Sequence, residues 1–121
     1  MSHRILIADD EPNIVVSLEF MLKRAGYEVL VARDGTQALA MIRAERPDLV
    51  LLDGMMPGLS GFEVCEAVRA DAGLSAVRIM MLTAKGRETD VARGMGAGAD
   101  AYVIKPFSTR ELMDRIGGIL A

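Results

Sequence analysis

Residues 47–61, PDLVLLDGMMPGLSG, predict the fold of the whole chain. The run from Leu49 to Leu52 is continuously apolar, which is typical of a strand buried on both faces in a parallel sheet covered by helices. The strand ends at a single carboxylate, Asp53, and a loop rich in glycine and proline follows. Such a turn exposes Asp53 at the carboxyl edge of the sheet, where open α/β sheets bind their ligands.

The composition predicts one domain over residues 1–121. A length of 121 residues is near the commonest domain size, and 51% hydrophobic residues can fill a core. The net charge of -3 comes from interspersed charges, so we expect no direct nucleic-acid binding by this segment. One cysteine, no apolar run of membrane-spanning length and no signal peptide predict a cytoplasmic protein without membrane association.

Along the rest of the chain, short apolar runs alternate with segments in which apolar residues recur at helical spacing. Strands are expected at residues 5–8, 28–32, 49–53, 77–82 and 101–104. Helices are expected at about 12–25, 38–46, 62–68, 88–97 and 109–120. Because crossovers between parallel strands are right-handed, this alternation predicts an α/β fold: a doubly wound, five-stranded parallel sheet with five helices on its two faces.

Local signals mark several helix ends. Gly26 stands where a left-handed C-cap would end the first helix. Ser108 and Glu111 have the spacing of a capping box before the last helix. Gly94, Gly96 and nearby Gly98 weaken the fourth, which we expect to be the least rigid.

Polar residues follow four of the predicted strands. Asp9 and Asp10 end the first strand, Asp53 the third, Thr83 the fourth and Lys105 the fifth. Because the carboxyl ends of parallel strands share one edge of a sheet, all five side chains should converge there.

This set of side chains points to a metal ion and to phosphoryl chemistry. Three neighbouring carboxylates raise one another's pKa unless a metal or a proton offsets their charge. Oxygen ligands without histidine or cysteine suit a hard ion such as Mg²⁺. A lysine and a hydroxyl opposite a carboxylate match the oxygens of a phosphoryl group in transfer, and an aspartate can accept that group covalently.

The chain resembles the response-regulator receiver domain of two-component signalling over essentially its whole length. The resemblance is carried by Asp9-Asp10, by LLDGMMPGLSG, by MLTAKG and by GAGADAYVIKPF, which occur in the order of the family. It implies a flavodoxin-like sheet with strand order 2-1-3-4-5, which puts the site at the topological switch point. It also implies a cis peptide between Lys105 and Pro106.

The resemblance assigns a role to each polar residue. Asp53 would be the phosphoacceptor, receiving the group from a histidine kinase or phosphotransfer protein. Thr83 and Lys105 would contact the phosphoryl oxygens, and Tyr102 would be the switch aromatic. The implied Mg²⁺ ligands are Asp9, Asp10, Asp53 and the backbone carbonyl of Met55.

Two positions depart from the family pattern. Gly54 replaces the usual branched apolar residue, from which we expect a looser backbone after Asp53. Ala101 occupies a position that is often acidic in receivers that dimerise through the fourth helix, fifth strand and fifth helix. We therefore expect a monomer, or a weak dimer that depends on phosphorylation.

Other interpretations remain open at this stage. Each aspartate alone could be a helix cap or a turn residue. A phosphohydrolase with an aspartyl nucleophile would use the same groups, but it needs a general acid that the loop after Asp53 lacks. A flavin-binding domain would need a phosphate loop in place of Asp-Asp-Glu-Pro. A degenerate receiver would only bind a partner.

The function that we expect is a signalling switch rather than an enzyme. Phosphorylation adds charge and acceptor oxygens, and such a change acts by biasing an element with two arrangements. We expect residues 83–97 and Tyr102 to respond, altering the face formed by the fourth helix, the fifth strand and the fifth helix. That face would control an output partner or an output domain.

Overall fold

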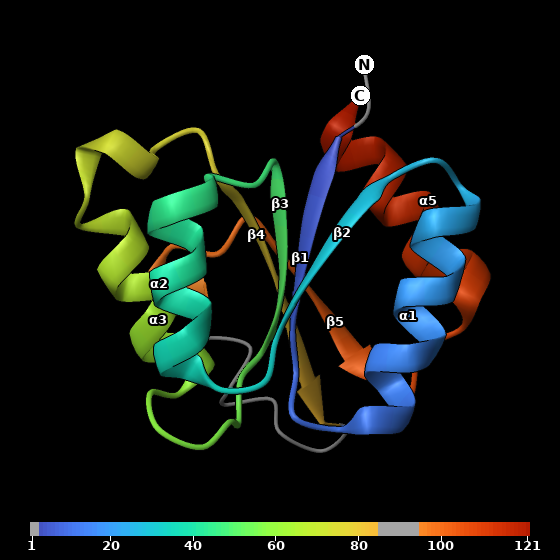
Figure 1. The fold of residues 1–121 in the computed structure, drawn as a ribbon, viewed down its shortest axis with the longest axis horizontal. Coiled ribbons are helices and arrows are strands. Elements are labelled where there is room, and N and C mark those ends of the chain that lie inside the picture. Colours follow the sequence, from blue (N-terminus) through green and yellow to red (C-terminus); the bar gives the residue numbers. More distant parts are fainter. Residues whose placement is uncertain (1–2, 85–94) are drawn as a thin grey trace.

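The computed structural model describes residues 3–84 and 95–121, with only the backbone described at 83 and 84. A central sheet lies between two layers of helices (Figure 1). The elements are β1 (Arg4–Ala8), α1 (Pro12–Arg24), β2 (Glu28–Ala32), α2 (Gly35–Glu45), β3 (Leu49–Asp53), α3 (Gly61–Arg69), the 3₁₀ turn η1 (Ala72–Leu74), β4 (Arg78–Ala84), β5 (Ala101–Lys105) and α5 (Thr109–Leu120).

The five strands form one parallel sheet in the order β2-β1-β3-β4-β5. In the middle of the sheet, Leu51 of β3 lies between Ile7 of β1 and Met80 of β4. The predicted α/β class and strand order are confirmed. Their consequence is that the ends of β1 and β3, which carry the predicted aspartates, are direct neighbours.

Alternate side chains of each strand point to opposite faces, so the sheet separates two hydrophobic cores. Ile5 and Ile7 pack with α1 and α5, whereas Leu6 and Ala8 pack with α2 and α3. Figure 1 shows these two helix pairs on opposite sides of the sheet. β3 is buried along its whole length, because both of its faces are covered.

Most of the expected element boundaries agree with the structure to within a residue or two. β4 begins at Arg78 and extends to Ala84, two residues beyond the predicted end, and residues 95–97 are the part of the expected fourth helix that lies among the described residues. Gly26 has the predicted left-handed conformation, with φ of 97°. At Ser108 one half of the predicted capping box is present, since its Oγ accepts the N–H of Glu111 at 3.0 Å.

The sequence reasoning overlooked a complete capping box at the start of α3. Ser60 Oγ accepts the N–H of Glu63 at 3.2 Å, and Glu63 Oε1 accepts the N–H of Ser60 at 3.1 Å. The signal was present in the sequence, because serine followed three residues later by glutamate is the signature of this motif. The box fixes where the loop after Asp53 ends and α3 begins.

Gly54, where we expected a looser backbone, is held by two backbone hydrogen bonds and lies against one aromatic ring. Its N–H donates to the carbonyl of Leu82 at 3.1 Å, and its own carbonyl accepts the N–H of Gly61 at 3.1 Å. The ring of buried Phe62 takes the space of the absent side chain, since a Cβ at Gly54 would lie 3.0 Å from it. The loop therefore returns tightly onto the end of β3.

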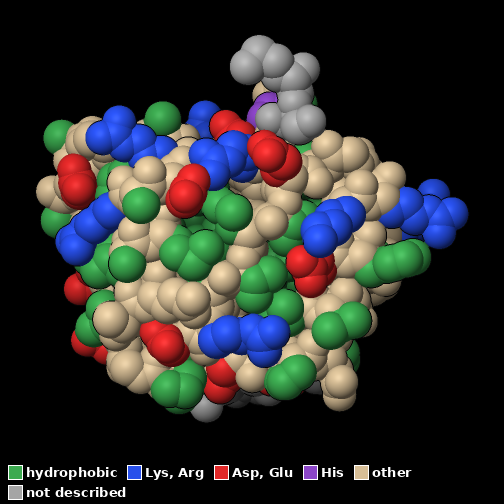
Figure 2. Space-filling view, in the orientation of Figure 1, with side chains coloured by type: hydrophobic (Ala, Val, Ile, Leu, Met, Phe, Trp, Pro, Cys, Tyr) green, Lys and Arg blue, Asp and Glu red, His purple; other side chains and the backbone are tan. Residues whose placement is uncertain are grey.

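The described surface combines both signs of charge. Figure 2 shows acidic and basic side chains interspersed with apolar ones on the face in view. Of the helices in residues 3–84 and 95–121, none has the length and apolar character needed to cross a bilayer.

We predict that Gly61→Ala destabilises the domain by about 1–3 kcal/mol, the usual cost of overpacking. A Cβ at Gly61 would lie 2.1 Å from the carbonyl oxygen of Asp53, so the backbone that carries this aspartate must shift. Urea denaturation followed by circular dichroism measures the change in the free energy of unfolding.

Gly117→Ala is the matched control for this substitution. Gly117 lies within α5, and a Cβ there would contact nothing within 4 Å. Alanine at this position should stabilise the domain by about 0.5–1 kcal/mol, because it lowers the entropy of the unfolded chain and favours the helix. Equal effects of the two substitutions would contradict the close approach at Gly61.

Candidate functional site

Asp53 is the last residue of β3 and lies at the carboxyl edge of the sheet. Only 6% of its surface is exposed, so the predicted exposure of Asp53 is wrong: the carboxylate is at the sheet edge but is buried there. One carboxylate oxygen, Oδ1, accepts the N–H of Met55 at 3.1 Å. This hydrogen bond fixes the carboxylate against the loop, and Oδ2 faces the ammonium of Lys105.

Asp9 and Asp10 follow β1, the neighbour of β3 in the sheet. Asp9 is fully buried and Asp10 is exposed. One carboxylate oxygen from each of Asp9, Asp10 and Asp53 lies within 4.8 Å of the others, which is the only grouping of metal-binding side chains of this size among the described residues. Three converging carboxylates with one open, exposed side fit a hard divalent cation that keeps some of its water ligands.

Lys105 brings a positive charge to these acids from the end of β5. Its Nζ donates a hydrogen bond to Asp9 Oδ2 at 3.0 Å and lies 3.6 Å from Asp53 Oδ2. The Lys105 side chain is only 15% exposed. The peptide bond from Lys105 to Pro106 is cis, as the resemblance implied.

Burial and neighbouring charges together shift the pKa values of Asp53 and Lys105. Burial is the main reason that the pKa of Asp53 rises from 3.8 to about 6; the charges of Asp9 and Asp10 add to the rise, while the Met55 N–H and Lys105 oppose it. Burial by itself would lower the pKa of Lys105, but its hydrogen bond to Asp9 and the charge of Asp53 raise the pKa overall. The lysine is therefore an ammonium ion at neutral pH.

The remaining predicted site residues lie around this centre. Thr83 pairs with Ile104 where β4 adjoins β5, and its side chain lies outside the described part of the structure. Tyr102 of β5 is half-buried and packs against the core beneath α2 and α3. Met55, the first exposed residue of the loop, has 53% of its surface accessible.

Glu11 is a member of this site that the sequence reasoning missed. Its Oε1 accepts a hydrogen bond from Lys105 Nζ at 3.2 Å, and its N–H donates to Asp9 Oδ1 at 2.9 Å. The available signal was the third acid in the run Asp-Asp-Glu, directly before the proline that opens α1. Nothing in the sequence indicated that the side chain would reach the end of β5.

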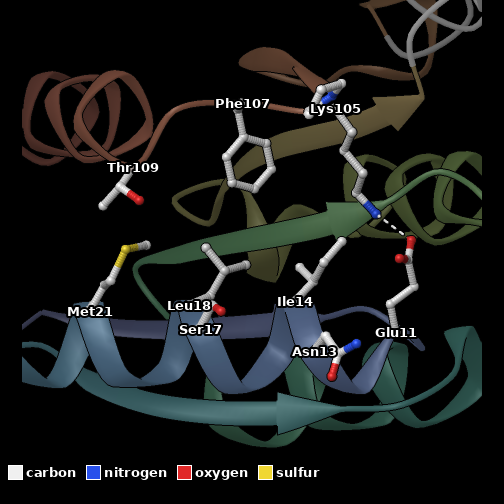
Figure 3. Close-up of a pocket in the computed structure, with 10 residues that line it drawn as sticks. Glu11, Asn13, Ile14, Ser17, Leu18, Met21, Lys105, Phe107 and Thr109 are labelled. Atoms are coloured by element: carbon white, nitrogen blue, oxygen red, sulfur yellow. Dashed lines mark hydrogen bonds and ion pairs between the residues drawn. The ribbon is translucent and has the colours of Figure 1, made fainter.

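A groove of about 620 Å³ begins at the pair formed by Glu11 and Lys105 and follows α1. Figure 3 shows this ion pair at one end, with Ile14 and Leu18 on the helix side and Phe107 opposite them. Lys105 therefore contributes both to the acidic centre and to the wall of the groove.

Comparison with known proteins identifies the family. Residues 5–117 match the family described as the response regulator receiver domain. The DNA-binding response regulator MtrA of Mycolicibacterium smegmatis is 48% identical over 96% of this chain, which spans half of the length of that relative.

Solved structures agree with this match. A putative response regulator from Chloroflexus aurantiacus superposes with a TM-score of 0.94 at 38% identity, covering 99% of this chain and 98% of that one. The receiver domain of a sensor histidine kinase from Pseudomonas aeruginosa, solved with a magnesium ion in its active-site cleft, gives a TM-score of 0.90 at 31% identity, covering 99% and 98% of the two chains. The chain belongs to the response regulator receiver domain family.

Proposed function

We propose that this domain is a phosphorylation-activated signalling switch in which Asp53 accepts a phosphoryl group from a histidine kinase or a phosphotransfer protein. The observation that carries the proposal is the convergence at one sheet edge of Asp53, two further carboxylates and the Lys105 ammonium. We assign Asp53 as the acceptor because it ends the central strand, lies beside the Lys105 ammonium and stands in the family's phosphoacceptor position. Membership of the receiver family supports the same assignment.

The transfer itself is a displacement at phosphorus. An Asp53 carboxylate oxygen forms a bond to phosphorus while the bond from phosphorus to the donor breaks, and the donor keeps the bonding electron pair. Lys105 offers its ammonium to the phosphoryl oxygens, and we assign the hydroxyl of Thr83 to the same oxygens. Both groups stabilise negative charge that grows during the transfer.

Mg²⁺ is the ion that we assign to the three carboxylates. When bound, it offsets their charge and that of the incoming phosphoryl group. Asp9, Asp10 and Asp53 would hold it, together with the backbone carbonyl of Met55. The magnesium-containing relative from Pseudomonas aeruginosa supports this choice.

A phosphohydrolase with an aspartyl nucleophile is not favoured. Such an enzyme places a general acid beside its nucleophile. The loop from Gly54 to Ser60 contains no acidic residue, and the residue two positions after the nucleophile is Met55, whose side chain cannot donate a proton. A stable phosphoryl state that is read by a partner fits these residues better than rapid turnover.

An output partner or domain would bind at the edge of the sheet that β5 forms. Tyr102 is half-buried on this edge strand and Ile104 is 42% exposed, so both can change their packing at small cost. Thr83, in the neighbouring strand, links this edge to the phosphoryl oxygens. We infer that an output domain or a separate output protein receives the signal; the relative MtrA is described as a DNA-binding response regulator.

We predict that acetyl phosphate with Mg²⁺ adds one phosphoryl group to the wild-type protein and none to Asp53→Ala. Intact-mass spectrometry measures the adduct directly. Asp114→Asn, in the exposed middle of α5, is the matched control and should be phosphorylated like the wild type. An undiminished adduct on Asp53→Ala would show that another residue is the acceptor.

We predict that Mg²⁺ affinity falls as the pH drops through 6. The pKa of Asp53 is raised to about 6, so Asp53 is ionised above that pH and holds a proton below it. Because the cation needs the ionised form, affinity at about pH 5 should be roughly tenfold weaker than at neutral pH. Isothermal titration calorimetry at the two pH values measures the difference.

Asp10→Asn provides the comparison for this titration. The substitution removes one ligand and one negative charge and should weaken Mg²⁺ binding strongly at both pH values, whereas Asp114→Asn should bind as the wild type does. Equal affinity of Asp10→Asn and wild type would place the cation elsewhere.

We predict that beryllofluoride, a phosphoryl mimic, changes amide hydrogen exchange in residues 83–97 and in β5, leaving α1 and α2 almost unaltered. The reason is that Thr83 and Lys105, at the carboxyl ends of β4 and β5, are the residues that we assign to the phosphoryl oxygens, whereas no residue of α1 or α2 is assigned to them. Mass spectrometry of peptic fragments measures the exchange. A response confined to α1, α2 or the loop after Asp53 would contradict this route.

A further inference from the structure

Lys105 pairs with three carboxylates. One of them lies outside the acidic cluster, the group formed by Asp9, Asp10 and Asp53. The Nζ of Lys105 is 3.0 Å from Asp9, 3.2 Å from Glu11 and 3.6 Å from Asp53. Asp9 and Asp53 belong to the group of three acids that can hold a cation, whereas Glu11 does not. The ammonium is thus nearer to Glu11, which has no part in the chemistry, than to the proposed acceptor.

We propose that Glu11 is a positioning residue that restrains Lys105 in the unphosphorylated state and thereby slows phosphoryl acceptance by Asp53. This inference rests on the proposed function of Asp53. The ammonium must leave the Glu11 carboxylate before it can reach the oxygens of an incoming phosphoryl group. We call this slowing of phosphorylation by the Glu11–Lys105 ion pair the brake.

The backbone around Glu11 gives this restraint a fixed origin. Asp9 Oδ1 accepts the Glu11 N–H at 2.9 Å, and Pro12 then starts α1, so Glu11 is held at its own N–H and by the helix that begins at the next residue. From this anchored position the side chain reaches across the end of the groove to Lys105 (Figure 3). The Glu11 side chain is 59% exposed, whereas the Lys105 side chain is 15% exposed. The ion pair therefore joins a solvent-exposed carboxylate to a largely buried ammonium.

The electrostatic attraction of Glu11 for the Lys105 ammonium matters most once the acidic cluster holds a cation. The charges of Asp9 and Asp53 are then offset, and their attraction for the ammonium weakens. Glu11 keeps its full charge, because it lies outside the cluster. Its competition with the phosphoryl oxygens is therefore greatest in the state that is ready to react.

Two variants distinguish the effect of the ion pair between Glu11 and Lys105 from the long-range effect of the negative charge at Glu11. Glu11→Gln removes the charge and keeps the length of the side chain. Glu11→Asp keeps the charge and shortens the side chain by one methylene, about 1.5 Å, which breaks an ion pair that spans 3.2 Å. Glu111→Gln, at the start of α5, removes an equal charge from a residue that makes no ion pair with Lys105 and serves as the control.

The first measurement is the rate of phosphorylation by acetyl phosphate at saturating Mg²⁺, followed by intact mass. We expect Glu11→Gln and Glu11→Asp each to react about two- to fivefold faster than wild type, the range that corresponds to an ion pair with one exposed partner. Glu111→Gln should react at the wild-type rate. Acceleration by Glu11→Gln alone would mean that only the long-range charge of Glu11 affects the rate, which would overturn the proposal. Unchanged or slower rates in both variants would show that Glu11 does not slow phosphorylation, which would also overturn it.

The second measurement follows the lysine itself in the metal-free protein. Lys105 is one of three lysines in the chain, and its ammonium can be followed by ¹⁵N NMR. Its protons should exchange with water faster in both Glu11 variants, because one of its ion pairs is gone while those with Asp9 and Asp53 remain. A change in thermal stability alone would not move this signal selectively. Unaltered exchange would refute the restraint even if the rates had changed.

The outcome also distinguishes this inference from the function on which it rests. A wild-type protein that acquires no phosphoryl group overturns the proposed function and the brake together. A wild-type protein that is phosphorylated at Asp53, with Glu11 variants that match it in both measurements, overturns the brake alone.

Discussion

The repulsion among three carboxylates held at one sheet edge is the constraint on which the rest of the site depends. Asp9 and Asp53 are buried beside one another because β1 and β3 are adjacent strands. No backbone rearrangement can relieve their repulsion, since both strands are fixed in the centre of the sheet. A counter-charge has to come from elsewhere, and the ammonium of Lys105 provides it.

The strand order explains why this counter-charge is a lysine. β4 lies between β3 and β5, so the Lys105 backbone is two strand spacings, roughly 10 Å, from β3. Only a long side chain that extends over the end of β4 can cover that distance. The ammonium also has to serve several oxygens in turn, which suits a flexible point charge better than the rigid fork of arginine.

The fold and the centre of the site were accessible from the sequence because both follow from local patterns. Continuous apolar runs such as Leu49 to Leu52 locate buried strands, and acids directly after such runs locate the sheet edge. Strand order needed the family resemblance, since periodicity carries no information about which strands are adjacent. Glu11 and the fit of Phe62 against Gly54 escaped prediction because each depends on contacts between segments that the chain order does not reveal.

The division of the interior by the sheet means that the two sides of the domain can vary independently. Among residues 3–82 and 95–121, the core beneath α2 and α3 and the core beneath α1 and α5 share no buried residue. Substitutions on helices of opposite layers are far apart and lack common partners, so their effects on the free energy of unfolding should add. A lineage, or a protein engineer, can therefore reshape the surface of α1 and the groove beside it to suit a new partner while α2, α3 and the loop that holds Asp53 keep their packing.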